Sequence, residues 1–237
     1  MPRIPREHLD AIAAYGARTT WPAGFIVYER GTRADGIFVV LRGQIVLRTQ
    51  VGSGRSFVPW LATTGETFGG EGLQRDARYA STARAEEESE TLHLSGARFS
   101  ALLREQPAHA LALMRQVMAE HTSLIEKFGE HATLTVEQRL IAALLRLAGN
   151  REAVADDGPV IRPIVPRRLL GELVGATRES ISLVLGRLAA EGLVEREGNG
   201  LVITDLDRLS SKLSLGERAT DIPLADDRAV VEERIVS

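Results

Sequence analysis

The sequence predicts an α+β protein in which a β-rich N-terminal part, one long helix and a helical C-terminal part follow one another. Three observations predict this order: short β-branched runs separated by glycines, apolar residues at helical spacing from Pro107 onward, and two short helical segments followed by a hairpin. The 237 residues suffice for two cores, and 44% hydrophobic with 26% charged residues is ordinary globular composition.

The N-terminal part is predicted to be a small jelly-roll β-barrel. Its β-prone runs are short, and glycines such as Gly31, Gly43 and Gly65 stand between them at turn-like intervals. A domain with a single sheet agrees less well with this regular spacing of short strands and glycine-containing turns. We expect strands at residues 24–29, 36–41, 44–49, 56–61 and 91–94.

The long helix is predicted to begin at Pro107, since proline is favoured at the first helical position. Its apolar and histidine side chains recur at alternating spacings of three and four, which is typical of a coiled-coil seam. A second apolar face allows one side to pack on the barrel while the other meets a twin helix, which favours a parallel homodimer; the stripe could instead dock wholly on the barrel. The predicted seam is Met114, Val117, His121, Leu124, Phe128 and His131, and the second face is Leu111, Leu113, Met118 and Ile125.

A further amphipathic helix is expected at 134–147, after a hinge at 130–135, and a polar loop at 150–159 precedes a strand-like segment at 160–165. Residues 165–204 then read as a helix-turn-helix closed by a hairpin wing. Gly175 interrupts the first helix, Thr177 can cap the second, and that helix ends near Gly192. The hairpin strands, 193–196 and 201–204, flank the turn Glu197-Gly198-Asn199-Gly200. The apolar positions are Leu169, Leu170, Leu173 and Val174, then Ile181, Val184, Leu185 and Leu188.

The second helix of this motif presents polar groups of the kind that contact DNA. Arg178 can make a bidentate contact with guanine, and Glu179 can accept a hydrogen bond from the cytosine amino group. Ser182 can add an adaptable contact, and Leu183 an apolar contact with a thymine methyl group. Alternatively, Arg178 and Glu179 form only surface ion pairs. Phosphate contacts are expected from Ser180 and Arg187.

Charge and composition restrict the function further. The net charge is −3, but residues from Asp205 onward hold eight acids and five bases, while 159–204 has six arginines and five glutamates. This thin basic surplus predicts modest non-specific DNA affinity. The absence of cysteine excludes disulfides, iron–sulfur clusters and thiolate zinc sites. Without an apolar run of about 20 residues or a signal-peptide pattern, we expect a cytoplasmic protein with no membrane partner.

Several segments resemble the cyclic-AMP receptor protein/fumarate-nitrate regulator (CRP/FNR) family over about residues 15–205. Leu173-Val174-Gly175-Ala176-Thr177-Arg178-Glu179-Ser180-Ile181 resembles its recognition segment, while 36–45 and 65–71 resemble the hairpin and pocket loop of its cyclic-nucleotide-binding-type barrel. The resemblance implies a homodimeric transcription regulator, not an enzyme, that binds a palindromic double-stranded operator, and RNA polymerase if it is an activator. We expect a sensor barrel at 1–106, a dimerisation helix at 107–133, a DNA-binding domain at 134–215 and an acidic tail at 216–237.

The predicted effector pocket departs from the family pattern for cyclic AMP. Gly70 and Glu71 match the family's ribose-binding pair, although Glu71 could simply cap backbone amides of its loop. Tyr79-Ala80 stands where an Arg-Ser pair holds the phosphate, and Leu124-Ile125 replaces the adenine-facing hydroxyl pair. A buried phosphate would therefore lack its partners, unless Arg75, Arg78 or Arg84 substitutes from a repositioned loop; Arg84 is more simply a residue on the face of a strand. We expect a regulator that does not depend on cyclic AMP, with an effector that is unknown or absent.

The alternative function is a cupin-like metal-dependent enzyme with a helical appendage, because similar barrels occur in such enzymes. Before the helices, however, the barrel segment supplies only His93, whereas cupin metals need several histidine or carboxylate ligands. The sequence predicts no metal ligands, cofactor or catalytic residues.

Overall fold

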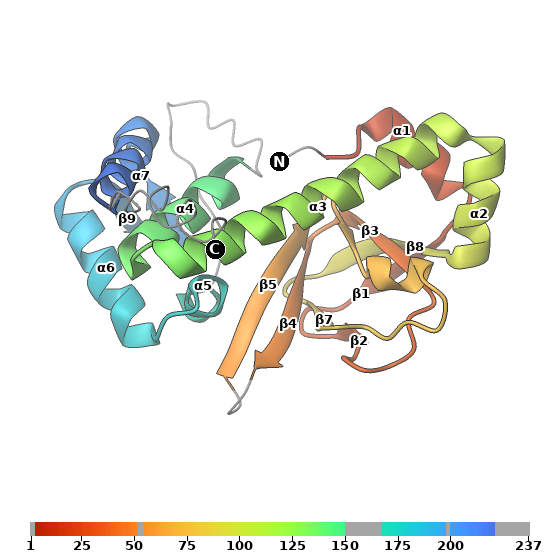
Figure 1. Cartoon of the computed structure of the whole chain (residues 1–237), viewed down its shortest axis with the longest axis horizontal. Helices are drawn as coiled ribbons and strands as arrows, with labels where there is room; N and C mark the ends of the chain where they lie inside the picture. Colours follow the sequence, from red (N-terminus) through yellow and green to blue (C-terminus); the bar gives the residue numbers. More distant parts are fainter. Residues whose placement is uncertain (1–2, 52–54, 150–166, 198–199, 221–237) are drawn as a thin grey trace, which may run out of the picture.

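The computed structural model describes residues 3–51, 55–149, 167–197 and 200–220. Helix α3 (Pro107–Thr133) runs from the barrel to the C-terminal domain, and lies along one side of the strands (Figure 1). The short helix α1 (Arg6–Ala13) precedes the barrel, and α2 (Gly96–Glu105) connects the barrel to α3. The expected α+β architecture with a barrel, a long helix and a C-terminal helical domain is confirmed.

The barrel consists of two four-stranded antiparallel sheets. All five predicted strands are present, but the sequence analysis missed β1, β6 and β7 as well as α1 and α2. One sheet has the order β1-β8-β3-β6, formed by Ala17–Trp21, Ser89–Ser95, Gly36–Arg42 and Thr67–Phe68. The other has the order β2-β7-β4-β5, formed by Ile26–Tyr28, Thr82–Ala85, Gln44–Val51 and Arg55–Thr63.

Two glycine-dependent turns shape the barrel. Gly43 joins β3 to β4 with a φ of 88°, and a Cβ there would lie 2.4 Å from Ser89 Oγ, so a side chain is excluded. Gly69 has a φ of 73° and precedes the single 3₁₀ turn η1 (Gly70–Leu73). This turn places the Glu71 side chain at the mouth of the barrel, next to α3.

Helix α3 has two distinct faces. Leu113, Gln116, Ser123 and Lys127 are buried against the barrel. The exposed apolar side chains repeat at spacings of three, four, seven and three, and are Leu111, Met114, Met118, Ile125 and Phe128.

This exposed stripe corrects the predicted seam. Met114, His121 and Phe128 are exposed, although His121 also lines a cavity between α3 and the barrel, whereas Val117 and Leu124 pack against the barrel clusters. Leu111, Met118 and Ile125, expected on the barrel side, are exposed, and only Leu113 of that predicted face is buried. Val117 and Met118 are neighbours along the helix, as are Leu124 and Ile125, and either member of each pair fits an alternating spacing of three and four. Spacing alone therefore does not show which of the two faces the barrel.

The C-terminal domain is a helix-turn-helix with a two-stranded wing. The start of α4 (Val136–Gly149) is capped reciprocally, because Thr135 N donates to Gln138 Oε1 (2.8 Å) and Gln138 N donates to Thr135 Oγ1 (3.3 Å). The predicted loop at 150–159, the strand-like segment at 160–165 and the chain from 221 lie outside the described residues. The elements are α4 (Val136–Gly149), α5 (Arg167–Val174), α6 (Arg178–Ala190), β9 (Val194–Glu197), β10 (Gly200–Ile203) and α7 (Leu206–Thr220).

One buried apolar cluster extends from the barrel into the C-terminal domain. Val46, Val58 and Leu61, on the outer side of the β4–β5 hairpin, belong to the same buried cluster as the helices α4, α5 and α6. At the edge of this junction Arg48 Nη2 lies 2.7 Å from Glu172 Oε2 of α5. The hairpin therefore connects the two domains directly.

Candidate functional sites: helix α6 and the barrel cavity

The start of α6 is fixed by local chemistry. Thr177 Oγ1 accepts a hydrogen bond from Ser180 N at 3.2 Å, which is the predicted N-cap. Before it, Gly175 has a φ of 66°, a conformation that sharply reverses the chain between the two helices. The buried face of α6 consists of Ile181, Val184, Leu185 and Leu188, as predicted.

The opposite face of α6 is solvent-exposed and holds the predicted DNA-contacting side chains. Arg178, Glu179 and Ser182 are exposed, and the exposed fraction of Leu183 is 72%. The pKa of Glu179 is lowered by a hydrogen bond from its own backbone amide and then by the Thr177 side chain. Glu179 is therefore an ionised acceptor at neutral pH, as a contact with a cytosine amino group requires.

Arg187 and Ser180 have protein partners that sequence reasoning missed. The Arg187 guanidinium lies 2.7 Å from Glu137 Oε2 of α4, and Glu137 also pairs with Lys212 of α7 (3.2 Å). The Arg187 side chain is still 61% exposed. Ser180 is half-buried, with its Oγ 3.1 Å from Thr177 Oγ1. Both predicted phosphate contacts thus sit beside the exposed face rather than at its centre.

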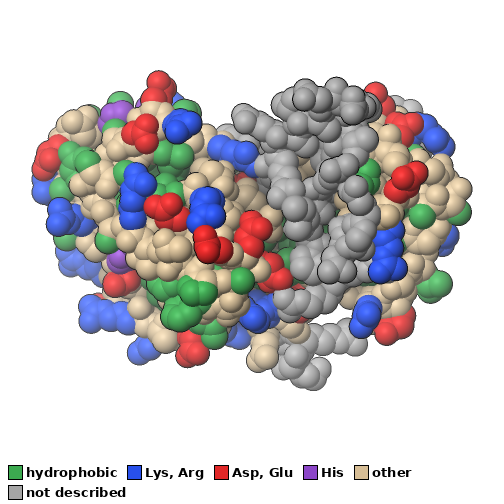
Figure 2. Space-filling view, turned by 180° about the vertical axis from the view of Figure 1, so that it is seen from behind, with side chains coloured by type: hydrophobic (Ala, Val, Ile, Leu, Met, Phe, Trp, Pro, Cys, Tyr) green, Lys and Arg blue, Asp and Glu red, His purple; other side chains and the backbone are tan. Residues whose placement is uncertain are grey.

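The wing follows α6 as predicted. Strands β9 and β10 pair in antiparallel register, with Leu201 opposite Arg196, and Thr204 Oγ1 donates to Gly192 O at 2.6 Å. Acidic and basic side chains are interspersed over the face of the molecule that Figure 2 displays.

A second candidate site is a cavity of about 400 Å³ between the barrel and α3. Of the predicted pocket residues, Gly70, Glu71, Ala80 and Leu124 line it. Tyr79 is not among the lining residues but stacks on Tyr28 with 3.6 Å between ring centroids, and Ile125 points outward with 59% exposure. The other lining residues are Leu47, Thr49, Pro59, Trp60, Ser81, Val117, Glu120 and His121.

The electrostatics of this cavity differ from those of a phosphate site. Glu71 Oε1 accepts a hydrogen bond from Ala80 N at 3.2 Å, so it does cap a backbone amide of its loop. Neither arginine nor lysine is among the lining residues. Glu120, which the sequence analysis did not single out, accepts from Thr67 Oγ1 at 3.2 Å, and burial raises its pKa to about 8. Glu120 lies three residues after Val117 and four before Leu124, and this spacing could have placed it on the same face of the helix as those two residues.

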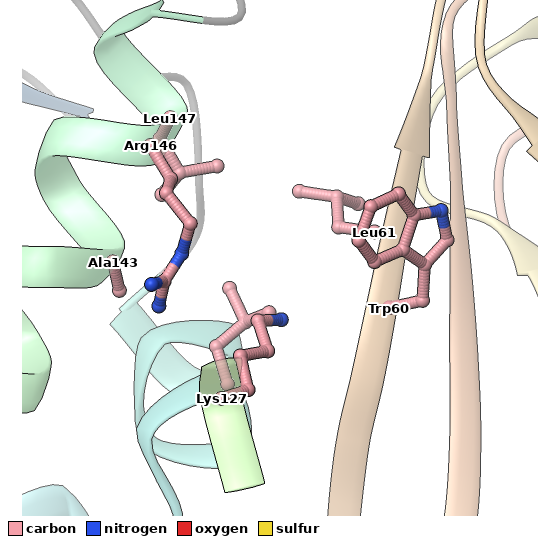
Figure 3. Close-up of a pocket in the computed structure, with 7 residues that line it drawn as sticks. Trp60, Leu61, Lys127, Ala143, Arg146 and Leu147 are labelled. Carbon is pink, nitrogen blue, oxygen red and sulfur yellow. The ribbon is translucent and has the colours of Figure 1, made fainter. Parts of the chain in front are cut away.

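A smaller cavity of about 40 Å³ marks the domain junction (Figure 3). Arg146 of α4 and Lys127 of α3 extend toward the space that faces Trp60 and Leu61 of β5. Lys127 Nζ donates to Pro59 O at 2.9 Å and lies 5.8 Å from the Trp60 ring centroid, while Arg146 pairs with Glu130. Burial, with a further contribution from Arg146, lowers the pKa of Lys127 to about 7.

These features define a winged helix-turn-helix DNA-binding protein with a sensor-type barrel. Family models agree: a Crp-like helix-turn-helix domain matches residues 138–212 and a cyclic nucleotide-binding domain matches residues 18–106. The chain belongs to the CRP/FNR family of transcription regulators. Within the described residues there is no cluster of three or more potential metal ligands, and no helix long and apolar enough to cross a membrane.

Two relatives agree with this assignment, and a solved structure has the same fold. The chain is 30% identical over 216 residues to the cyclic AMP receptor protein of Thermus thermophilus, covering 89% of this chain and 94% of that one. It is 27% identical over 202 residues to the cAMP-activated global transcriptional regulator Vfr of Pseudomonas aeruginosa, covering 83% and 94%. The structure of the c-di-GMP-responsive global regulator CLP of Xanthomonas campestris is similar, with a TM-score of 0.71, 23% identity, and coverage of 85% and 100%.

Proposed function

We propose that this transcription regulator acts as a cytoplasmic homodimer on a palindromic operator and does not respond to cyclic AMP. In this proposal residues 1–106 form the sensor, 107–133 the dimerisation helix and 134–215 the DNA-binding domain, with 216–237 as a tail. An activator of this kind would also contact RNA polymerase. The observation that carries the proposal is the exposed face of α6, where Arg178, Glu179 and Ser182 lie free of the domain core.

The exposed stripe of α3 supports the homodimer. Its members, from Leu111 to Phe128, repeat with the spacing of a coiled-coil seam on the side of the helix away from the barrel. Phe128 alone is 79% exposed, which is unusual for a large aromatic side chain unless a partner covers it. A parallel twin of α3 would place two copies of α6 in successive major grooves, about 34 Å apart.

The cavity chemistry supports independence from cyclic AMP. The cyclic phosphate of that nucleotide is an anion, and it would enter a cavity lined by Glu71 and Glu120 with no arginine or lysine among its lining residues. A buried anion without a cationic partner is costly, and no arginine or lysine among the lining residues of this cavity supplies one. Although two relatives are named for cyclic AMP, the residues at this site favour another effector, or none.

The test is operator selection followed by one substitution. A randomised-library selection with the purified protein should yield a two-fold symmetric site containing G·C pairs. Arg178→Ala should then weaken binding to that site by about 1–3 kcal/mol, or roughly 5- to 150-fold, with little change on unrelated DNA. Arg104→Ala removes an exposed arginine of α2, in the N-terminal part, and serves as the matched control. Equal losses on both DNAs for Arg178→Ala would contradict base recognition by α6.

A further inference from the structure

The barrel cavity has a strongly uneven chemistry. One carboxylate, Glu71, comes from η1, and a second, Glu120, comes from α3. Both side chains line the same cavity, and the charges of Glu71 and of nearby Glu66 add to the effect of burial in raising the pKa of Glu120. No cationic residue among the lining positions offsets these charges, although His121 lines the cavity from the exposed side of α3.

The remaining wall is largely apolar and aromatic. Leu47, Pro59 and Trp60 line it from the barrel, and Val117 and Leu124 line it from α3. Trp60 is only 3% exposed, and its Nε1 has no hydrogen-bond partner among the described residues. Figure 3 shows this nitrogen on the side of the ring turned away from Lys127 and Arg146. The part of this wall that Trp60 supplies is therefore an aromatic surface, which suits the apolar part of a ligand.

We propose that this cavity binds a small amphipathic amine, with its ammonium group at Glu120 and Glu71 and its apolar body against Trp60, Leu124 and Val117. The inference rests on the proposed function, since it assumes that the barrel senses something other than a cyclic nucleotide. An ammonium group would neutralise the repulsion between the two carboxylates and can also lie against an aromatic face. The volume of about 400 Å³ lies within the range of small-molecule sites.

The proposal predicts a particular pH dependence. Because the Glu120 carboxyl has a pKa of about 8 without ligand, it is mostly protonated at pH 7, and an ammonium ligand must displace that proton. Affinity for an amine should therefore rise with pH, by up to about tenfold per unit between pH 6 and 8, until Glu120 is fully ionised. A neutral ligand of the same shape would show no such rise.

The experiment uses the full chain and three probes with one carbon skeleton: phenylbutylamine, phenylbutanol and phenylbutyrate. Isothermal titration calorimetry at pH 8 should give an affinity for the amine at least tenfold above that for the alcohol, with no detectable binding of the carboxylate. Glu120→Gln should remove the advantage of the amine. Glu126→Gln, on the exposed side of the same helix, is the matched control and should leave it unchanged.

Folding of the variant can be checked separately. Glutamine resembles the protonated carboxyl that Glu120 carries at pH 7, so Glu120→Gln should keep the thermal midpoint of the ligand-free protein. The inference is overturned if the alcohol or the carboxylate binds as tightly as the amine, or if none of the three probes binds at millimolar concentration. Cyclic AMP is included as a fourth probe. If it binds and raises operator affinity, the proposed function fails as well, whereas failure of the amine alone leaves it standing.

Discussion

Replacing Lys127 by methionine should remove a pH dependence from the stability of the protein. The substitution keeps a long apolar side chain at the domain junction but removes the ammonium group next to Pro59 O and the Trp60 ring. The pKa of Lys127 is lowered from 10.5 to about 7, because burial and Arg146 outweigh the favourable charges of Glu130 and Glu66. Between these two values the unfolded chain binds a proton that the folded protein has lost, so this residue makes stability rise with pH.

The size of the effect follows from the two pKa values. From pH 7 to pH 9, integration of the proton difference gives a stability gain of about 2 kcal/mol for the wild type that the Lys127→Met variant lacks. Urea unfolding at pH 7, 8 and 9, followed by tryptophan fluorescence, measures this difference. Lys212→Met is the control, because Lys212 lies on α7 and pairs with Glu137 and Glu191, and its raised pKa predicts no such gain. A difference between wild type and Lys127→Met that stays flat or falls with pH would refute the reasoning.

Three other substitutions test the seam, the cap and the junction. Phe128→Glu should dissociate the dimer and weaken binding to the palindrome far more than binding to a half-site. Leu103→Glu, at an exposed position of α2, is the control and should have neither effect. Analytical ultracentrifugation measures the dissociation, and an unchanged sedimentation coefficient for Phe128→Glu would contradict the predicted seam. Thr177→Ala should destabilise the C-terminal domain by about 1 kcal/mol in thermal unfolding, and an unaltered midpoint would contradict the cap. Glu172→Gln leaves Arg48 without its charged partner, so it should lower the free energy of unfolding by about 1–2 kcal/mol and accelerate limited proteolysis. Proteolysis at the wild-type rate would rule out a role for this ion pair in holding the barrel against the C-terminal domain.

The parts of the fold that follow from local chemistry could be predicted from the sequence. Thr177 and the glycines at 175 and 192 define α6 because capping and positive φ are properties of single residues. By contrast, β6 is a two-residue strand (Thr67–Phe68), too short to produce an alternating pattern. Strand β1 contains Arg18, Thr19 and Thr20, with no buried member, so hydrophobicity did not reveal it.

The candidate sites were predictable where one segment carries them and not where several meet. The exposed face of α6 lies within a single helix, and its residues were found together. Glu120 contributes to the cavity only because α3 packs over Thr67 and η1, which are distant in sequence. Likewise, the ion pair of Arg187 with Glu137 joins α6 to α4 across the domain. Such contacts arise from tertiary packing, and no spacing rule along the chain encodes them.

Strand β5 connects the wall of the larger barrel cavity to the DNA-binding domain through two adjacent residues. Trp60 belongs to the barrel core and Leu61 to the cluster shared with α4, α5 and α6, and both line the small cavity at the domain junction. A single planar peptide group separates their Cα atoms, and we expect an occupant that shifts the indole to shift the surface on which α5 rests as well. Linkage then requires reciprocity: an operator that repositions α5 changes the affinity of the barrel for its occupant by the same factor.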